Sequence, residues 1–366
     1  MEELNLHDSR KTNIMKGIIL HGGHGTRLRP LTHTGPKQLL PIANKPMSQY
    51  CLEKIKESGI EDVAIIIGGI GSKKVQEFYG NGEKFGVKIT YFHQEQPKGI
   101  AHAINLCKEF IGNEKFLVFL GDNIIKKNIS EYVKEFETSQ IDASVLLCEV
   151  NNPTQFGIAE VKENKIVKIV EKPKDPPSNL AVTGIYLLSP KIFDIFKRLK
   201  PSWRDELEIT DALDMLLNEN NKITFYMVTD YWKDTGTPAD ILHANQLLLE
   251  DLTSYNHGEI EEDVNISGNV MIGKNSIIKS GVIIKGPIII GENCIIEGNA
   301  ELGPNISIGN NSKLSGCKIK NSIIMDEAEI RCNQKIHNSI IATNSRILSS
   351  DEEKTLLLGE GTKITL

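Results

Sequence analysis

The chain has 366 residues and a formal net charge of −6, so it is long enough for two domains and gives no reason to expect a nucleic acid partner. No apolar run approaches the ~18 residues of a membrane-spanning helix, and residues 1–14 are too polar for a signal peptide. The six cysteines lack a CxxC pair or zinc spacing. We therefore expect buried thiols in a cytoplasmic protein without a membrane partner.

The first predicted element is a buried strand at residues 17–20, followed by a glycine-rich loop. The loop contains three glycines and a threonine: Gly22, Gly23, Gly25 and Thr26. Glycines let several backbone N–H groups approach a phosphate, and the forked guanidinium of Arg27 suits phosphate oxygens. Leu28 stands where a dinucleotide fingerprint needs its third glycine, and no Walker spacing is present. A plain glycine turn with surface arginines is the alternative.

Strand and helix patterns alternate after this loop. Helical spacing covers residues 47–59, 101–110 and 130–137, and buried strands are expected at residues 63–67, 87–92, 115–120 and 143–150. This alternation predicts an α/β fold with a mostly parallel, doubly wound sheet and helices on both faces. Because ligands in such sheets bind beyond the carboxyl ends of the strands, the loops at that edge should converge on one site.

Two aspartates are candidate metal ligands. Asp122 directly follows the strand at residues 116–120, and Asp234 lies in a glycine turn at residues 231–237. Two carboxylates near a triphosphate would suit Mg²⁺, although the sequence does not show that they meet. Taken alone, an aspartate at a strand end such as Asp122 is more often a helix cap or a turn residue than a metal ligand.

Gln94 and Gly99 lie in a loop after the third strand. An amide can pair with the donor–acceptor edge of a pyrimidine, and a glycine lets a base approach the backbone. A solvated loop glutamine is the alternative. Farther on, residues 156–160 and 166–170 predict a hairpin that leads into Glu171 and Lys172, a pair that elsewhere is usually a solvated ion pair.

The second half is repetitive. An aliphatic residue recurs every sixth position at Ile266, Ile272, Ile278, Ile284, Ile290, Ile296, Leu302, Ile308 and Leu314. This period predicts a left-handed parallel β-helix of hexapeptide repeats, with looser coils after Leu314. Its open ends and flat faces suit contacts in a homo-oligomer. Acyltransferase activity, known for such helices, needs a histidine base, and neither His257 nor His337 has a recognisable partner.

The combined motifs carry a family resemblance. GGxGTRLxPLT followed by PKQLLP, then GD, EKP and WxDTGT, resembles the sugar-1-phosphate nucleotidylyltransferases. The resemblance implies catalytic roles for Arg27, Lys37 and Asp122 and metal binding by Asp122 and Asp234. It implies nucleotide binding by Leu20, Gly22, Gly23, Gly25, Thr26, Gln94 and Gly99. It implies sugar phosphate binding by Gly157, Glu171, Lys172, Val182, Thr183, Gly184 and Arg204.

Within this family, residues 182–184 and the added β-helix resemble the long form of the glucose-1-phosphate thymidylyltransferases. The implied reaction joins dTTP and glucose 1-phosphate with Mg²⁺ by direct in-line displacement. UTP-dependent transfer to glucose 1-phosphate or N-acetylglucosamine 1-phosphate is the nearest alternative. A catalytically inactive scaffold subunit is a remote one, since some such subunits pair the same two domains.

The expected organisation is a catalytic domain at residues 15–252, a β-helix at residues 257–350 and an N-terminal extension at residues 1–14. Two features depart from the family pattern. His21 and His24 lie inside the signature loop, where relatives carry small residues, and Asp205 replaces a glycine after Arg204.

Overall fold

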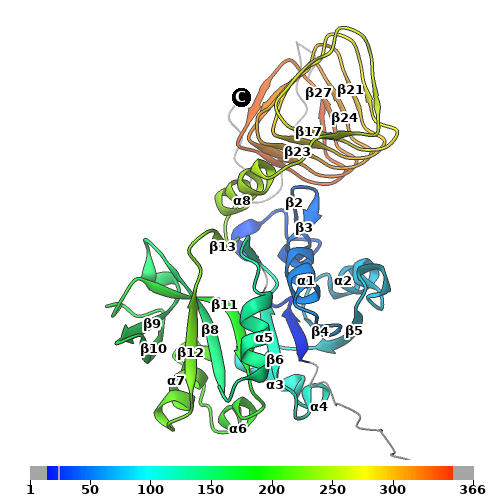
Figure 1. Ribbon diagram of the computed structural model, residues 1–366. Coiled ribbons are helices and arrows are strands. Elements are labelled where there is room, and N and C mark those ends of the chain that lie inside the picture. Colours follow the sequence, from blue (N-terminus) through cyan, green and yellow to red (C-terminus); the bar gives the residue numbers. More distant parts are fainter. Residues whose placement is uncertain (1–14, 24, 349–366) are drawn as a thin grey trace, which may run out of the picture.

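The computed structural model describes residues 15–23 and 25–348. The predicted N-terminal extension, His24 and the last two residues of the expected β-helix therefore lie outside the described part. Two bodies are joined by helix α8 (Pro238–Glu250), as Figure 1 shows: an α/β body below and a triangular β-helix above. None of the helices in the described part of the chain combines the length and apolar character that a bilayer crossing requires.

The α/β body is built on a nine-stranded sheet with the path β10-β9-β11-β6-β1-β4-β5; β8 also pairs with β11, and β12 pairs with β8. Its parallel part consists of β1 (Lys16–Leu20), β4 (Asp62–Ile67), β5 (Lys88–His93) and β6 (Phe116–Leu120). The central strands are buried on both faces, as expected for a parallel sheet covered by helices. The predicted doubly wound architecture is confirmed.

Antiparallel strands extend the other side of the sheet. They are β8 (Ala143–Glu149), β9 (Gly157–Lys162), β10 (Lys165–Glu171) and β11 (Leu180–Leu188), while β12 (Ile223–Met227) runs parallel to β8. The predicted hairpin is β9–β10. Small ladders add β2 (Pro41–Ile42) with β3 (Lys45–Pro46), and β7 (Asn123–Ile125) with β13 (Trp232–Asp234).

Helices cover the sheet and complete two apolar clusters. They are α1 (Met47–Glu57), α2 (Ser72–Tyr79), α3 (Ile100–Leu106), α4 (Lys108–Ile111), α5 (Ser130–Thr138), α6 (Ile192–Phe196) and α7 (Ile209–Asn218). Short 3₁₀ turns lie at Thr26–Leu28, Lys37–Leu39, Glu83–Phe85 and Pro153–Gln155. The single helix expected at residues 101–110 is divided into α3 and α4 at Cys107, whose N–H bonds to Ile104 in a tighter turn.

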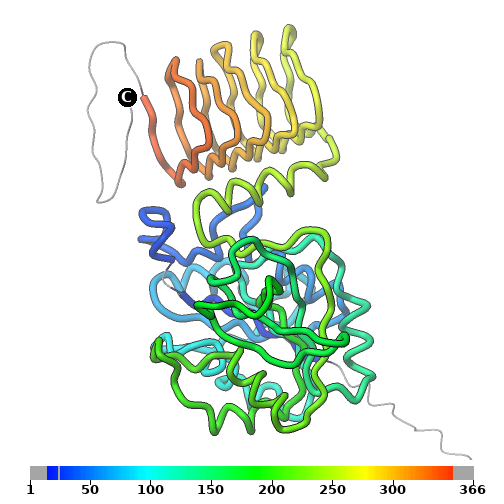
Figure 2. The backbone as a smooth tube through the Cα atoms, turned by 90° about the vertical axis from the view of Figure 1, so that its left-hand side faces the viewer, coloured from blue at the N-terminus to red at the C-terminus, as the bar shows by residue number. Residues whose placement is uncertain are grey.

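The β-helix consists of three parallel sheets whose strands stack coil on coil, as Figure 2 shows. The first sheet contains β14 (Tyr255–Asn256), β17 (Val270–Ile272), β20 (Ile288–Ile290), β23 (Ile306–Ile308), β26 (Ser322–Ile324) and β29 (Ile340–Ile341). The second contains β15 (Glu259–Ile260), β18 (Ile277–Ile278), β21 (Ile295–Glu297), β24 (Lys313–Ser315), β27 (Glu329–Arg331) and β30 (Arg346–Leu348). The third contains β16 (Asn265–Ser267), β19 (Ile283–Lys285), β22 (Glu301–Leu302), β25 (Lys318–Lys320) and β28 (Lys335–His337).

The strand register explains why the six-residue period fades. Ile290 pairs with Ile308, eighteen residues later, but Ile308 pairs with Ile324, sixteen residues later. The later coils are therefore shortened while their strands remain stacked. The repeat aliphatics fill the core, except that Ile266 is exposed because its first coil has no neighbour on one side. Five of the six cysteines are buried, Cys148 is half-buried, and all are free thiols, as predicted.

Helix α8 ties the two bodies together. Its Ile241 and Ala244 pack with Ile323 and Met325 of the β-helix in one apolar cluster. The buried side chain of Asn245 accepts hydrogen bonds from the Ala43 N–H (2.8 Å) and from the Ser307 Oγ (2.6 Å). The junction is therefore both apolar and specifically hydrogen-bonded.

Candidate active site

The glycine-rich loop leaves β1 at Leu20 and turns back over the sheet edge. Gly23 and Gly25 have φ values of 97° and 57°, which favour glycine. A Cβ at Gly25 would lie 2.9 Å from Thr32, whose Oγ1 donates to the Gly25 carbonyl (2.8 Å). The loop is thus held by its own continuation.

A pocket at this edge joins the loop to the predicted base-reading segment. Its lining includes Gly22 and Gly23 on one side and Gln94 on another. The Gln94 Nε2 atom donates to the Gly99 carbonyl (3.3 Å) and lies 2.9 Å from the Nδ1 atom of His102. Gly99 has a neighbour that we did not expect: a Cβ there would lie 2.5 Å from the backbone oxygen of Leu207. Its missing side chain accommodates another chain segment.

The two aspartates meet through a short antiparallel ladder. Strand β13 pairs with β7, so Asp234 lies opposite Asn123, the neighbour of Asp122. Thr235 also donates to the Asp122 carbonyl, through its N–H (3.2 Å) and its Oγ1 (2.7 Å). Residues more than a hundred positions apart therefore form one carboxylate pair at the carboxyl end of β6.

Charge at this pair is tightly balanced. Lys37 forms an ion pair with Asp122. Burial opposes ionisation, but Lys37 outweighs it and holds the pKa of Asp122 below its ordinary value, while the two aspartates hold the pKa of Lys37 above its own. Burial, and then the Asp122 charge, raise the pKa of Asp234 to about 6. The Oδ1 atom of Asp234 is buried without a hydrogen-bond partner among the described residues.

That unpartnered carboxylate oxygen fits a cation. Mg²⁺ is typically held by one or two carboxylates together with phosphate oxygens and water. Among the described residues, no cluster of three or more His, Cys, Asp or Glu side chains forms a complete metal cage. Asp122 and Asp234 are therefore suited to a metal ion that arrives with a phosphate substrate.

Arg27 faces the same carboxylates from the glycine-rich loop. A Cβ at Gly236 would lie 2.9 Å from the Nη2 atom of Arg27, so the glycine in the turn after Asp234 leaves room for the guanidinium. The side chain is exposed, and its charge acts on Asp234. The arrangement leaves a cation available at the mouth of the site.

A second pocket contains most of the predicted sugar-binding residues. Asp122 and Asp234 line it together with Gly157, Glu171, Lys172, Val182, Thr183 and Gly184. Glu171 accepts a hydrogen bond from the Thr210 Oγ1 (3.0 Å), and Lys172 lies 3.6 Å from it. Two glycines here are sterically required, since a Cβ at Gly157 would lie 2.4 Å from Thr210 and one at Gly184 would lie 2.7 Å from Leu120.

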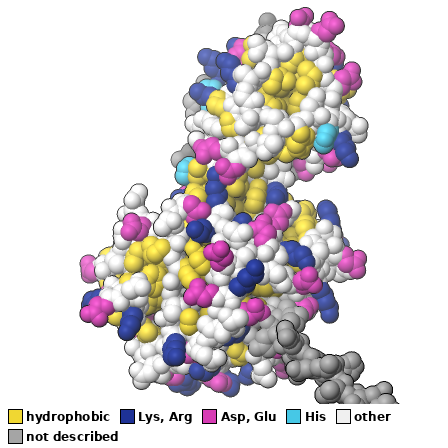
Figure 3. Space-filling model, in the orientation of Figure 1, with side chains coloured by type: hydrophobic (Ala, Val, Ile, Leu, Met, Phe, Trp, Pro, Cys, Tyr) yellow, Lys and Arg dark blue, Asp and Glu magenta, His cyan; other side chains and the backbone are white. Residues whose placement is uncertain are grey.

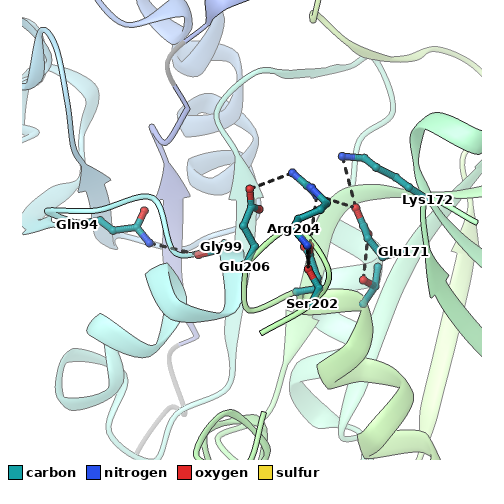
Figure 4. A network of polar contacts seen from close by, with 9 residues as sticks. Gln94, Gly99, Glu171, Lys172, Ser202, Arg204 and Glu206 are labelled. Carbon is teal, nitrogen blue, oxygen red and sulfur yellow. Dashed lines mark hydrogen bonds and ion pairs between the residues drawn. The ribbon is translucent and has the colours of Figure 1, made fainter. Parts of the chain in front are cut away.

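Arg204 is not among the residues that line this pocket, but it contacts the lining residue Glu171 from a loop before α7. Its guanidinium contacts Glu171 (3.3 Å), Glu206 (3.0 Å) and Glu208 (3.3 Å), and Figure 4 shows it between Glu206 and Glu171. Asp205 has φ 60°, a left-handed conformation that explains why a glycine suits this position. Burial, and then Glu171, raise the pKa of Glu208.

Several contributors were missed from the sequence. Glu206 and Glu208 hold Arg204, His102 contacts Gln94, and the Trp232 Nε1 donates to the Oδ1 atom of Asn123 (2.6 Å), the chain neighbour of Asp122. The available signal was proximity in the sequence, because Glu206 and Glu208 closely follow Arg204 and His102 is near Gly99. His21 is also buried, and burial lowers its pKa to about 3, so the ring is neutral at pH 7.

The described coils of the β-helix, up to residue 348, show no comparable constellation. His257 stacks on Tyr255, with ring centroids 4.7 Å apart, and His337 lies in a groove with several lysines. Neither ring is paired with a carboxylate within residues 15–23 and 25–348. These surroundings support a structural role for the β-helix over an acyltransferase site.

Comparisons with known proteins agree with this geometry. The family model described as nucleotidyl transferase matches residues 16–251, and a model described as the GMPPB C-terminal domain matches residues 284–365. The low-salt glycan biosynthesis nucleotidyltransferase Agl11 of Haloferax volcanii is 44% identical, over 96% of this chain and 100% of that protein. A glucose-1-phosphate thymidylyltransferase of Streptomyces antibioticus is 37% identical, over 96% and 99%.

A solved structure extends the comparison. It is described as a glucose-1-phosphate thymidylyltransferase of Bacillus anthracis in complex with sucrose, is 43% identical, and superposes with a TM-score of 0.62. It covers 66% of this chain and 98% of its own. Sequence similarity and fold similarity thus agree. The chain belongs to the nucleotidyl transferase family and is a sugar-1-phosphate nucleotidyltransferase that acts on a nucleotide and a sugar phosphate.

Proposed function

We propose that the chain transfers a thymidylyl group from dTTP to glucose 1-phosphate, giving dTDP-glucose and pyrophosphate. One observation carries this proposal. Lys37 lies against the glycine-rich loop, 3.3 Å from the position of a Gly25 Cβ, and it pairs with Asp122, which lines the pocket that contains Glu171. A nucleotide in the glycine-loop pocket that contains Gln94 and a sugar phosphate in the pocket that contains Glu171 would meet at these charges.

The chemistry needs positioning and charge neutralisation. A phosphate oxygen of glucose 1-phosphate attacks the α-phosphorus in line, and the bond to the departing pyrophosphate breaks. Arg27 neutralises the triphosphate and the leaving group, and Lys37 holds the α-phosphate region. No side chain needs to form a covalent intermediate.

Asp122 and Asp234 are the proposed Mg²⁺ ligands. Their proximity and the unpartnered Asp234 oxygen support this assignment. A bound Mg²⁺ supplies Lewis acid stabilisation to phosphate oxygens. The protein contributes the two carboxylates and balances them with Lys37.

The sugar phosphate would occupy the second pocket. Glu171 would accept hydrogen bonds from sugar hydroxyls, and Lys172 and Arg204, which both contact Glu171, would bind the phosphate. Arg204 contacts three carboxylates. A phosphate entering this pocket would compete with those carboxylates for the guanidinium.

Uridylyl transfer is the second candidate function. Thymine and uracil share an N3–H group, which can donate a hydrogen bond to the Gln94 oxygen. UTP differs from dTTP by a missing base methyl and an added 2′-hydroxyl, and a pocket seldom rejects either difference strongly. The Lys37–Asp122 ion pair and the proposed metal ligands Asp122 and Asp234 argue against an inactive scaffold.

Self-association stays a prediction. Figure 3 shows a hydrophobic area at the end of the β-helix that faces the viewer, and the first coil exposes Ile260 and Ile266.

The test is a grid of initial rates of pyrophosphate release with Mg²⁺. dTTP, UTP, CTP, ATP and GTP are each combined with the 1-phosphates of glucose, N-acetylglucosamine and mannose. We expect the highest kcat/KM for dTTP with glucose 1-phosphate. A preference for UTP would support the second candidate, and silence in every combination from a folded protein would support the scaffold.

A further inference from the structure

A histidine on α3 contacts the glutamine assigned to the base. The Nδ1 atom of His102 lies 2.9 Å from the Nε2 atom of Gln94, and the Gly99 carbonyl lies 3.3 Å from the same nitrogen. His102 is half-buried. No motif suggested a role for it in nucleotide recognition.

The partners of Gln94 fix the orientation of its amide. A backbone carbonyl can only accept a hydrogen bond, so the side of the amide that faces Gly99 must be the NH₂ group. The second amide hydrogen is directed to His102. Both donors of the side chain are therefore engaged within the protein, and the Oε1 atom is left as an acceptor.

That oxygen is directed toward the glycine-rich loop. It lies 4.0 Å from the position that a Cβ of Gly22 would occupy, and Gln94 and Gly22 line the same pocket. A nucleobase bound there would meet an acceptor. Thymine and uracil offer a donor at N3, whereas N3 of cytosine carries a lone pair.

The charge state of His102 agrees with this arrangement. Burial, and then the neighbouring Lys98, lower the pKa of His102 below its ordinary value, so the imidazole is neutral at pH 7. A neutral ring with its proton on Nε2 accepts at Nδ1. A charged ring would present a donor to the amide NH₂ group instead.

We propose that His102 is a positioning residue that locks the Gln94 amide with its oxygen toward the base and thereby selects thymine or uracil over cytosine. The inference rests on the proposed function, since it requires that Gln94 reads a pyrimidine. His102 acts through Gln94 and touches neither reacting phosphate. Loss of the ring leaves only the 3.3 Å bond to the Gly99 carbonyl to hold the NH₂ group, so the amide can turn over more easily and offer a donor to the base.

The test compares kcat/KM for dTTP, UTP and CTP in the wild type, two variants of His102 and one control variant. His102→Leu removes the acceptor at similar size, and His102→Gln restores one. We expect His102→Leu to lower the ratio of dTTP to CTP by roughly fivefold to tenfold, the worth of one hydrogen bond, while His102→Gln recovers most of it. Asn105→Leu, at an exposed position of α3, is the matched control and should leave the ratio unchanged.

The outcomes separate the inference from the function beneath it. The wild type should favour dTTP or UTP over CTP. If it does, but the dTTP-to-CTP ratio of kcat/KM in His102→Leu stays within twofold of the wild-type ratio, or the variant slows dTTP and CTP turnover equally, the inference is wrong and the function stands. If the folded wild type turns over no pyrimidine triphosphate, both fail. Melting temperatures of all three variants identify any loss that is due to unfolding.

Discussion

The two bodies of this molecule are specified by the chain in different ways. In the β-helix each strand of the inner coils pairs with the strands one coil before and after it, sixteen to eighteen residues away. In the α/β body, the active site joins Gly22, Gln94, Asp122 and Asp234, which are spread over more than two hundred residues. The β-helix is a local repeat, and the site is a product of long-range topology.

This difference separates stability from chemistry. The repeat aliphatics give the β-helix its own core, which α8 connects to the α/β body through one mixed junction. The charged residues of the site lie at strand ends and loops, where burial of carboxylates opposes folding. Changes in the β-helix should therefore affect stability, and changes in the site should affect turnover.

The largest effect is expected at Arg27. Replacing it with alanine removes a cation from the triphosphate and should lower kcat by about a hundredfold to a thousandfold, as for other preorganised charge-stabilising groups. Because the side chain is exposed, the melting temperature should stay unchanged. Steady-state rates of pyrophosphate release measure this. Arg331→Ala on the β-helix is the control, and near-normal kcat in Arg27→Ala would contradict the site assignment.

A core change in the β-helix should have the opposite profile. Ile296 is fully buried, and Ile296→Ala should cost about 2–5 kcal/mol of unfolding free energy through lost burial and a cavity. Urea denaturation measures this cost, and kcat/KM per folded molecule should stay unchanged. The control is Ile283→Ala at an exposed position of the same helix, which should cost much less. A selective loss of turnover in Ile296→Ala would refute the separation.

The junction should respond at an intermediate level. Asn245→Ala leaves the Ala43 N–H and the Ser307 hydroxyl without their acceptor, which should cost about 2–3 kcal/mol. We expect that, in calorimetry, the unfolding transitions of the α/β body and the β-helix lie farther apart in temperature in this variant than in the wild type. Gln246→Ala, at an exposed position of α8, serves as the comparison. An unaltered single transition at the wild-type temperature would show that the junction depends on apolar packing alone.

A gain in stability is expected when Asp234 is replaced by asparagine. The folded pKa of about 6 exceeds the ordinary 3.8, so the folded state binds more protons between these values, and wild-type stability falls as pH rises through this window. Asp234→Asn avoids that cost and should gain about 1–2 kcal/mol at pH 8, a gain that fades as the pH falls from about 6 to about 4. Urea denaturation without metal at both pH values measures this. An equal gain at pH 8 and pH 4 would show that ionisation is not the cause.

Much of the architecture could be predicted because its signals are local. Six-residue spacing predicted the stacked coils, and strands ending in Gly-Asp or Gln predicted which loops share the sheet edge. Loss of the period after Leu314 reflects shorter coils that keep their strands in register. The division at Cys107 was missed because apolar periodicity continues across a single tighter turn.

The missed parts of the site depend on loop paths. Gly99 was expected to let a base approach, but the backbone of Leu207 occupies the space where a Gly99 side chain would lie. No motif or periodic spacing in the sequence connects Leu207 with Gly99. Likewise, Glu206 and Glu208 carry no motif, and they contact Arg204 because their loop folds back before α7. Side chains that orient other side chains leave little trace in a single sequence.

The most direct test of the central claim is ³¹P NMR of the wild-type protein with Mg²⁺, dTTP and glucose 1-phosphate. The account predicts that signals of dTDP-glucose and pyrophosphate appear together in equal amounts, and that Arg27→Ala strongly slows both. A folded wild-type protein that leaves both substrates intact, or that releases pyrophosphate without forming a nucleotide sugar, would contradict it.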